Sequence, residues 1–247
     1  MAIVTRPCHN RRVLQPGPRL AALNARIVRC RRCPRLVAHR EASAAAPPRR
    51  YAGQQYWARP LPGFGDPYAR VLLVGLAPAA HGGNRTGRMF TGDQSGAWLF
   101  EALHHAGFAS QPVSERADDG LTLRDAYITA TIRCAPPANK PTPDEVAACR
   151  PYLLEELTLL DRARVVVGLG RIGWHAYLRA RKALGAAPPR TTPVFGHGVT
   201  TPFTDGTTLI ASYHPSQQNT FTGKLTRPML RGVFTTARAL LATGAPR

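Results

Sequence analysis

The chain alternates apolar runs typical of β-strands with stretches of helical periodicity, and this alternation limits the folds open to it. Four apolar runs are expected as strands, and a helix is expected after each of them. The expected strands are 71–76, 126–132, 165–169 and 209–213, and the expected helices are 96–106, 143–160, 172–184 and 229–242. Repeated β-α units produce a parallel sheet with helices on both faces. We therefore expect a three-layer α/β/α sandwich whose mostly parallel central sheet has about four strands.

The remaining segments are expected to complete a single domain over residues 19–247. Residues 1–18 are basic and irregular and are predicted to form an arm, and a helix is expected over 20–28. Residues 42–66 are rich in Pro, Gly and aromatic side chains, which predicts a long ordered loop. A hairpin is expected within 194–203. Thr142, Pro143 and Glu145 match a capping box at the start of the helix that follows them.

Two polar segments follow the first and the last of the expected strands. Residues 75–84 read Gly-Leu-Ala-Pro-Ala-Ala-His-Gly-Gly-Asn, and residues 214–226 read His-Pro-Ser-Gln-Gln-Asn-Thr-Phe-Thr-Gly-Lys-Leu-Thr. Open α/β sheets bind their ligands at the carboxyl ends of their strands. We therefore expect both segments to face one cleft.

Four of the five cysteines form a second pattern. Cys30 and Cys33 are separated by two residues, while Cys134 and Cys149 lie far downstream with fourteen residues between them. Four thiolates suit either zinc or an iron–sulfur cluster, and the spacing alone does not decide between them. The long interval between the pairs is unlike a compact zinc ribbon and favours a cluster. Cys8 is the fifth cysteine and is expected to be no ligand.

The strongly positive charge indicates a polyanionic partner, most simply a nucleic acid. The chain has 33 Lys and Arg against 14 Asp and Glu, a formal net charge of +19. Such binding is dominated by phosphate contacts and weakened by salt. A GC-rich genome, which enriches proteins in Arg, is the alternative explanation for part of the excess. Because no apolar run is long enough to span a bilayer or to act as a signal core, we expect a cytoplasmic protein without a membrane partner.

Four segments in this order, together with the four cysteines, resemble the uracil-DNA glycosylase superfamily and most closely its iron–sulfur branch, family 5. The segments are residues 75–79, 84–93, 133–142 and 214–226, and the resemblance covers residues 27–242. It implies a three-layer α/β/α fold and a 4Fe–4S cluster held by Cys30, Cys33, Cys134 and Cys149. It also implies a monomer that acts on lesion-bearing duplex DNA and on single-stranded DNA, near the nucleoid of a bacterium or archaeon.

The resemblance implies a repair enzyme that hydrolyses the N-glycosidic bond of a flipped, deaminated base and leaves an abasic site. Superfamily members strict for uracil carry a polar or acidic residue and a bulky aromatic in the first motif, and Asn at the end of the next strand. This chain has Ala77, Ala79 and Ala130 at these positions. A pocket without polar groups that hydrogen-bond to the base discriminates only weakly between bases. We therefore expect it to accept hypoxanthine as well as uracil, and to extend to xanthine and modified cytosines.

Three polar residues of the motifs are expected to carry the chemistry. A neutral His214 would donate a hydrogen bond to the base as negative charge develops there. Asp93 would orient the attacking water, although Asp at this position is also suited to cap the following helix. Asn139 is an alternative holder for the water or the base, and also a residue suited to a turn.

The resemblance further implies a pocket lining and a surface that contacts DNA. Phe90 would stack on the flipped base. The pocket residues are Gly75, Ala77, Pro78, Ala79, His81, Phe90 and Ala130. The loop 216–226 would enter the minor groove as a wedge. The DNA contacts are Ser216, Gln217, Asn219, Lys224 and Arg227.

Two functions from other classes fit part of the sequence. A non-catalytic nucleic-acid-binding protein with a four-cysteine zinc site explains the charge and the cysteines, but it leaves Asp93, Asn139 and His214 without a role. A hydrolase of free nucleosides or RNA fits the motifs, but the charge of +19 and the wedge-like loop argue against it.

Overall fold

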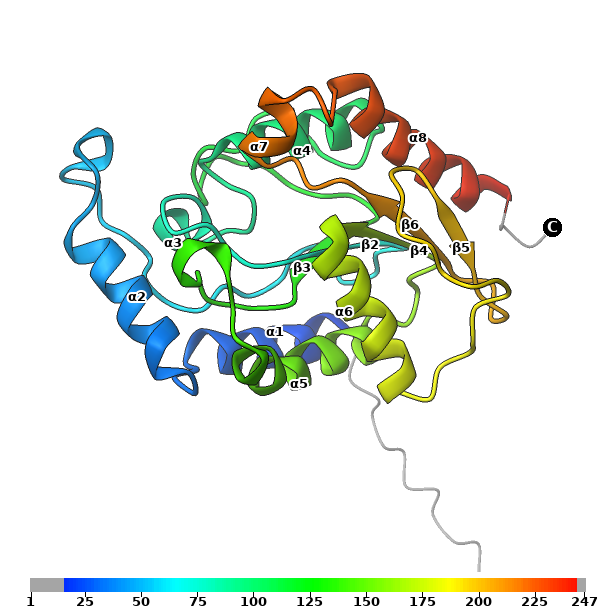
Figure 1. Ribbon diagram of the computed structural model, residues 1–247, viewed down its shortest axis with the longest axis horizontal. Coiled ribbons are helices and arrows are strands. Elements are labelled where there is room, and N and C mark those ends of the chain that lie inside the picture. Colours follow the sequence, from blue (N-terminus) through cyan, green and yellow to red (C-terminus); the bar gives the residue numbers. More distant parts are fainter. Residues whose placement is uncertain (1–15, 244–247) are drawn as a thin grey trace, which may run out of the picture.

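A six-stranded sheet in the order β1-β3-β2-β4-β6-β5 runs through the middle of the molecule (Figure 1). The structure is a computed structural model, and it describes residues 16–243. The four inner strands are parallel: β2 (Val71–Gly75), β3 (Ala126–Ala130), β4 (Val165–Leu169) and β6 (Thr208–Ser212). These are the four strands that the sequence predicts.

Two short edge strands make the sheet larger than the expected four strands. β1 (Phe64–Gly65) pairs antiparallel with β3, and β5 (Thr200–Pro202) pairs antiparallel with β6. Strands of two and three residues contain no apolar run long enough to stand out in the sequence. The hairpin expected within 194–203 forms between β5 and β6 instead.

Helices cover both faces of the sheet, so the predicted three-layer sandwich is confirmed (Figure 1). One face carries α4 (Gln94–His105) and α8 (Arg227–Thr243). The other face carries α1 (Pro16–Val28), α5 (Pro143–Leu159) and α6 (Gly170–Ala183). At the start of α5, Thr142 and Glu145 each accept a hydrogen bond from the other's backbone N–H, which confirms the predicted capping box.

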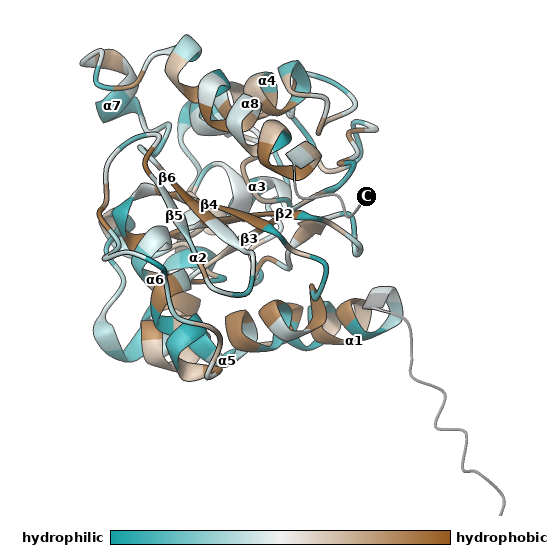
Figure 2. Ribbon diagram, turned by 90° about the vertical axis from the view of Figure 1, so that its right-hand side faces the viewer, coloured by the Kyte–Doolittle hydropathy of each residue, from teal (hydrophilic) through white to brown (hydrophobic). Residues whose placement is uncertain are grey.

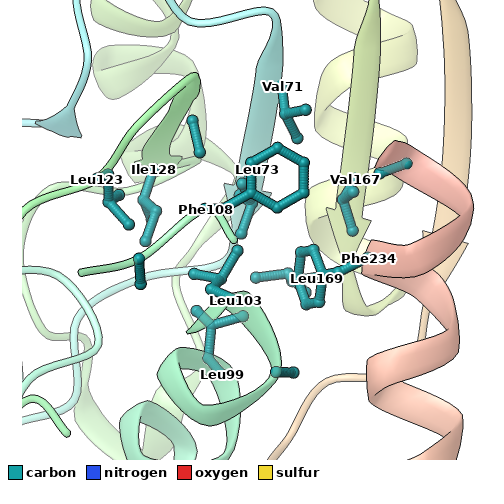
Figure 3. Packing of buried hydrophobic residues seen from close by; sticks show 14 of the residues in the cluster. Val71, Leu73, Leu99, Leu103, Phe108, Leu123, Ile128, Val167, Leu169 and Phe234 are labelled. Carbon is teal, nitrogen blue, oxygen red and sulfur yellow. The ribbon is translucent and has the colours of Figure 1, made fainter. Parts of the chain in front are cut away.

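Each inner strand is buried on both faces, and this explains its continuous apolar sequence. Val71 and Leu73 point towards α4 and α8, where they meet Leu103 and Phe234 (Figure 3). Leu72 and Val74, the alternate residues of β2, pack on the other face with residues of α1, α5 and α6. Figure 2 shows hydrophobic colouring along inner strands such as β2, β4 and β6, and both hydrophobic and hydrophilic stretches along the helices.

The helix α2 (Pro34–Ala45), at the left in Figure 1, was not predicted. Its last turn occupies the first residues of the expected loop 42–66, and a 3-10 turn, η1 (Arg49–Tyr51), interrupts that loop further. Only three of its residues are buried, so its apolar periodicity is weak. Pro34 in its first turn is the one clear sequence signal.

The helix α1 begins at Pro16, within the segment predicted to be an irregular arm. Residues 1–15, and with them Cys8, lie outside the described residues. Among residues 16–243, none of the helices has both the length and the apolar character that crossing a membrane requires.

Candidate active site and cysteine site

The segments after β2 and β6 meet at the carboxyl edge of the sheet. The strand register places Gly75 opposite Ala130, and Leu169 opposite Ser212. A cavity of about 380 Å³ opens at this edge, within the range of roughly 300–1,000 Å³ typical of small-molecule sites. Its lining residues are Leu76, Leu169, Gly170, Arg171, Ile172, Phe195, Tyr213, His214, Asn219 and Lys224. Both polar segments contribute, so the prediction of one shared cleft is confirmed.

The cavity combines apolar walls with two cations. Arg171, in the first turn of α6, lies over the Phe195 ring at 4.8 Å from its centroid. The ammonium group of Lys224 lies over the Tyr213 ring at 5.0 Å. Both cations are exposed. The walls therefore suit a planar apolar group, and the rim suits an anion such as phosphate.

His214 is held at the cavity by three neighbours. Asn219 donates its side-chain N–H to the His214 carbonyl at 2.8 Å. The Phe90 ring lies 5.8 Å from the His214 ring at an interplanar angle of 33°. Gly170 has φ +80° and packs so closely that an added Cβ would lie 3.2 Å from Cβ of His214. Burial lowers the pKa of His214 to about 4, so the imidazole is neutral at pH 7.

We expect the free energy of unfolding to fall as the pH is lowered from about 6.5 towards the folded-state pKa of His214, which is about 4. Over this interval the unfolded chain binds a proton at His214 that the folded chain does not, so acid favours unfolding. Urea unfolding at pH 7 and at pH 5 measures the loss. His214→Gln should lose less stability than the parent between these pH values, and an equal loss in both proteins would contradict the assignment.

Asp93 caps α4 and also touches the loop after β2. Its Oδ1 accepts a hydrogen bond from Gly96 N at 2.9 Å. Its Oδ2 packs against Gly82, where an added methyl group would collide with it. Burial raises the pKa of Asp93, an effect opposed by the backbone N–H groups of Gly96 and Ser95 and by Arg85. Asp93 therefore does cap the helix, and this hydrogen bond fixes its carboxylate beside Gly82 in the loop after β2.

The start of α4 is joined to the loop after β6. Gln94, next to Asp93, donates a hydrogen bond from Nε2 to Thr220 Oγ1 at 3.3 Å. Thr220 lies in α7 (Gln217–Phe221), which follows His214. Asp93 and His214 thus belong to two segments that are in direct contact through Gln94 and through Phe90.

The four cysteines line one cavity on the α1 and α5 face of the sheet: Cys30, Cys33, Cys134 and Cys149. All four are free thiols. Burial raises the pKa of the Cys149 thiol to about 12, so a bound metal would be needed to keep it ionised at neutral pH. Among residues 16–243, no three Cys, His, Asp or Glu side chains converge as a single metal ion requires. Four thiolates around one cavity suit either an iron–sulfur cluster or zinc, so the kind of metal centre stays a prediction.

The chain is similar to proteins of one family over most of its length. A profile described as the uracil DNA glycosylase superfamily matches residues 62–237. The chain belongs to this superfamily and to its type-5 branch. It is 53% identical over 211 residues to a type-5 uracil-DNA glycosylase of Thermus thermophilus, covering 85% of this chain and 93% of that protein.

Two further type-5 uracil-DNA glycosylases are similarly close. The protein from Mycobacterium tuberculosis is 51% identical over 222 residues, which cover 90% of this chain and 81% of that one. The protein from Pyrobaculum aerophilum is 50% identical over 214 residues, which cover 87% of this chain and 90% of that one. The expected family is therefore confirmed.

In this type-5 chain, three residues expected in the base pocket lie together. Ala130 ends β3 and is buried directly opposite Gly75. The Phe90 ring packs on Gly75, since a Cβ added there would lie 3.2 Å from Cζ of Phe90. Phe90 has φ +53°, an unusual backbone conformation for a bulky residue, and such conformations cluster at functional sites.

Other residues expected in the pocket have structural partners instead. Ala77 packs against the core on the cysteine face. Pro78 is buried against Gly83. His81 shares a 3.0 Å hydrogen bond with the Tyr56 hydroxyl. Leu76 is the residue of the first motif that lines the cavity.

The residues expected to contact DNA surround α7. Ser216 caps this helix by accepting a hydrogen bond from Asn219 N, and Gln217 is exposed. Arg227 is also exposed, lying over the Trp98 ring at 4.8 Å and 3.6 Å from a Glu101 carboxylate oxygen. The ion pair partly neutralises Arg227, and its contact with phosphate, like that of Lys224, stays a prediction.

Asn139 lies apart from the cavity lining, in the 3-10 turn η2 (Pro137–Asn139). It is exposed and has φ +56°. A left-handed backbone is what Asn tolerates in turns. Its expected role at the water or the base stays a prediction.

Several residues at or near the cavity were not singled out from the sequence, Arg171 among them. Gly170 supports His214, and Phe195 forms a cavity wall from a loop that precedes β5. Phe221 is 73% exposed at the end of α7. In the sequence, the available signal was one large apolar side chain between the polar residues Thr220 and Thr222.

Proposed function

We propose that this chain is a DNA repair glycosylase that removes uracil and other deaminated bases flipped out of DNA. The observation that carries the proposal is His214, held neutral at the edge of a cavity of about 380 Å³ whose lining includes Arg171 and Lys224. A neutral donor is suited to a base that becomes anionic. Two cations at the rim are suited to the phosphates on either side of a flipped nucleotide.

The reaction is hydrolysis of the bond between the base nitrogen and C1′ of the sugar. As this bond breaks, its electron pair moves to the base, and the imidazole N–H of His214 strengthens its hydrogen bond to the developing negative charge. Asp93, fixed by Gly96, orients a water towards C1′ and stabilises positive charge on the sugar. The water supplies hydroxyl to C1′ and a proton to the departing base.

We assign the cysteine site to a 4Fe–4S cluster bound by Cys30, Cys33, Cys134 and Cys149. Four thiols lining one cavity and membership of the type-5 branch support this choice. When bound, the cluster supplies a covalent cross-link between the chain's beginning and its middle. The residues proposed for base release lie in other loops.

The pocket is proposed to be permissive. Ala130 offers no amide to read the edge of a base, and Ala77 offers no carboxylate. Recognition then depends on stacking, through Phe90, and on shape. Mispaired nucleotides leave the helix most easily, so selection against normal bases would come from the cost of flipping.

Phe221 is proposed to fill the gap that the flipped nucleotide leaves. Replacing Phe221 by alanine should slow excision from a duplex with a U·G pair by about tenfold or more, since stacking on an aromatic is worth roughly 1–3 kcal/mol. Uracil in single-stranded DNA should be released at the parent rate, because no gap has to be filled. Leu184→Ala, which removes another exposed apolar side chain, is the control. Equal slowing on both substrates would remove the wedge role.

The proposed function is tested by incubating the protein with a duplex carrying one U·G pair and cleaving abasic sites with hot alkali. A nick at the uracil position is expected. Deoxyuridine and RNA, incubated without the alkali step and analysed by chromatography, should release no free uracil. Hydrolysis of the free nucleoside at a comparable rate would identify a nucleosidase instead. Tight duplex binding without any nick would identify a non-catalytic binding protein.

A further inference from the structure

Arg40 is a buried cation beside the cysteine site. It lies on α2 and is 2% exposed. Its Nη1 donates to Cys134 Sγ at 3.0 Å and to the Cys30 carbonyl at 3.4 Å, while its Nε has no hydrogen-bond partner. The guanidinium therefore faces the cavity that the four cysteines line.

No carboxylate neutralises Arg40 within residues 16–243, since none of the ion pairs there includes it. Arg133, the other fully buried arginine near this site, is paired with the buried Glu156. A buried charge is costly unless an opposite charge compensates it. If the cysteines bind a metal, the thiolate of Cys134, 3.0 Å from Arg40 Nη1, would supply that negative charge.

The backbone of Arg40 is tied to the loop after β2. Asn84 is fully buried in the short helix α3 (Gly83–Thr86), and its Nδ2 donates to the Arg40 carbonyl at 3.2 Å and to the Ala80 carbonyl at 3.3 Å. Its backbone N–H donates to the Ala79 carbonyl at 3.1 Å. One side chain thus joins α2 to both ends of the turn 79–84.

That same turn supports Asp93. Gly82 lies against Asp93 Oδ2 with no room for a side chain, so a shift of the turn would move the carboxylate. A continuous path of contacts therefore runs from Cys134 through Arg40, Asn84 and Gly82 to Asp93.

We propose that Arg40 and Asn84 are positioning residues that couple the metal centre to residues 79–86, the loop that lies against Asp93. The charge of metal-bound thiolates would hold the Arg40 guanidinium and thereby fix α2 at this residue. The Arg40 carbonyl then accepts the hydrogen bond from the Asn84 side chain, and Asn84 holds residues 79–86 against Asp93. The metal centre then matters for excision without taking part in the reaction. This inference rests on the proposed function, and it goes beyond it by naming how the two sites communicate.

The test compares Asn84→Ala, Arg40→Gln and the double variant with a control, Arg181→Gln. Arg181 is also a largely buried arginine, but it pairs with Asp205 away from both sites. Three quantities are measured: iron content, amide hydrogen exchange of residues 79–86 relative to α8, and single-turnover excision at saturating DNA.

Asn84→Ala should keep its iron, exchange faster in residues 79–86 but not in α8, and excise uracil about 10- to 100-fold more slowly, the usual cost of losing a supporting contact. Arg40→Gln should lose iron and loosen the same loop. Because both changes break the same path of contacts, the fold-decrease in excision rate of the double variant should be smaller than the product of the two single fold-decreases. The control should match the parent in loop exchange and in rate.

Unchanged hydrogen exchange of residues 79–86 in an iron-containing Asn84→Ala protein would overturn the proposal. A double variant whose fold-decrease in excision rate equals the product of the two single fold-decreases would also overturn it. If Arg40→Gln does not accumulate as a folded protein, Arg40→Lys, which keeps the charge but shortens its reach, takes its place. If the parent protein releases no base at all, the proposed function fails, while iron content and loop exchange still decide whether the two sites are coupled.

Discussion

Replacing His214 by alanine should slow base release from saturating uracil-containing DNA by about a hundredfold or more, the scale of losing one well-placed transition-state donor. Burial lowers the pKa of His214 to about 4, so at pH 7 the ring is neutral and has one N–H with which to donate a hydrogen bond. The donor acts only as charge develops on the base, so duplex affinity should change little. Single-turnover kinetics with enzyme in excess measure the effect.

His105→Ala is the matched control, because His105 is exposed on α4 and touches neither the cavity nor Asp93. It should retain the parent rate. A His214→Ala protein with a normal single-turnover rate would remove this residue from the mechanism. A protein that lost duplex affinity in proportion to its rate would indicate that His214 binds DNA and does not act on the transition state.

Replacing Cys134 by alanine should remove the brown colour expected of the purified protein and destabilise its fold. Cys134 follows β3, and the cluster would join it to Cys30 and Cys33 between α1 and α2. Loss of this cross-link should lower the midpoint of thermal unfolding by about 10 °C or more, since each kcal/mol is worth roughly 2–4 °C in a chain of this size. Visible absorption, iron analysis and calorimetry measure the change.

Cys8→Ala serves as the control and should stay brown with an unchanged midpoint. A bleached Cys8→Ala protein would mean that the wrong four cysteines were chosen. A colourless parent protein that contains one zinc per chain would contradict the cluster assignment and favour a zinc site.

The sheet was predictable because its inner strands are buried on both faces and therefore appear as apolar runs, as β4 (Val165–Leu169) does. The helices α4, α6 and α8 show clear apolar periodicity, α5 was placed by its capping box, and the ends of these four helices were placed within two residues. The helix α2 was missed because it buries only Leu36, Val37 and Arg40. The strands β1 and β5 depend on pairing with β3 and β6, a tertiary contact that a sequence of two or three residues does not record.

The position of His214 at the cavity was predictable because this residue follows directly after the apolar run of β6, while the roles of His214, Asp93 and Phe90 stay predictions. The lining of the cavity was not predictable where the chain changes direction. The strand β2 ends at Gly75, so its alternation of faces stops there, and Ala77 turns to the cysteine face while Leu76 reaches the cavity. Phe195 comes from a loop far from the motifs, and its place at the cavity follows only from the fold.

Base release from a panel of duplexes tests the proposed pocket most directly. Three duplexes carry uracil, hypoxanthine or only normal bases, and alkaline strand cleavage is followed at high enzyme excess. A pocket in which Ala130 reads no base edge and Phe90 stacks on any ring should release both uracil and hypoxanthine, faster from mispairs, and should leave the normal duplex intact. Release of uracil with hypoxanthine untouched would show that another residue reads the base, and no release from any lesion would contradict the glycosylase assignment itself.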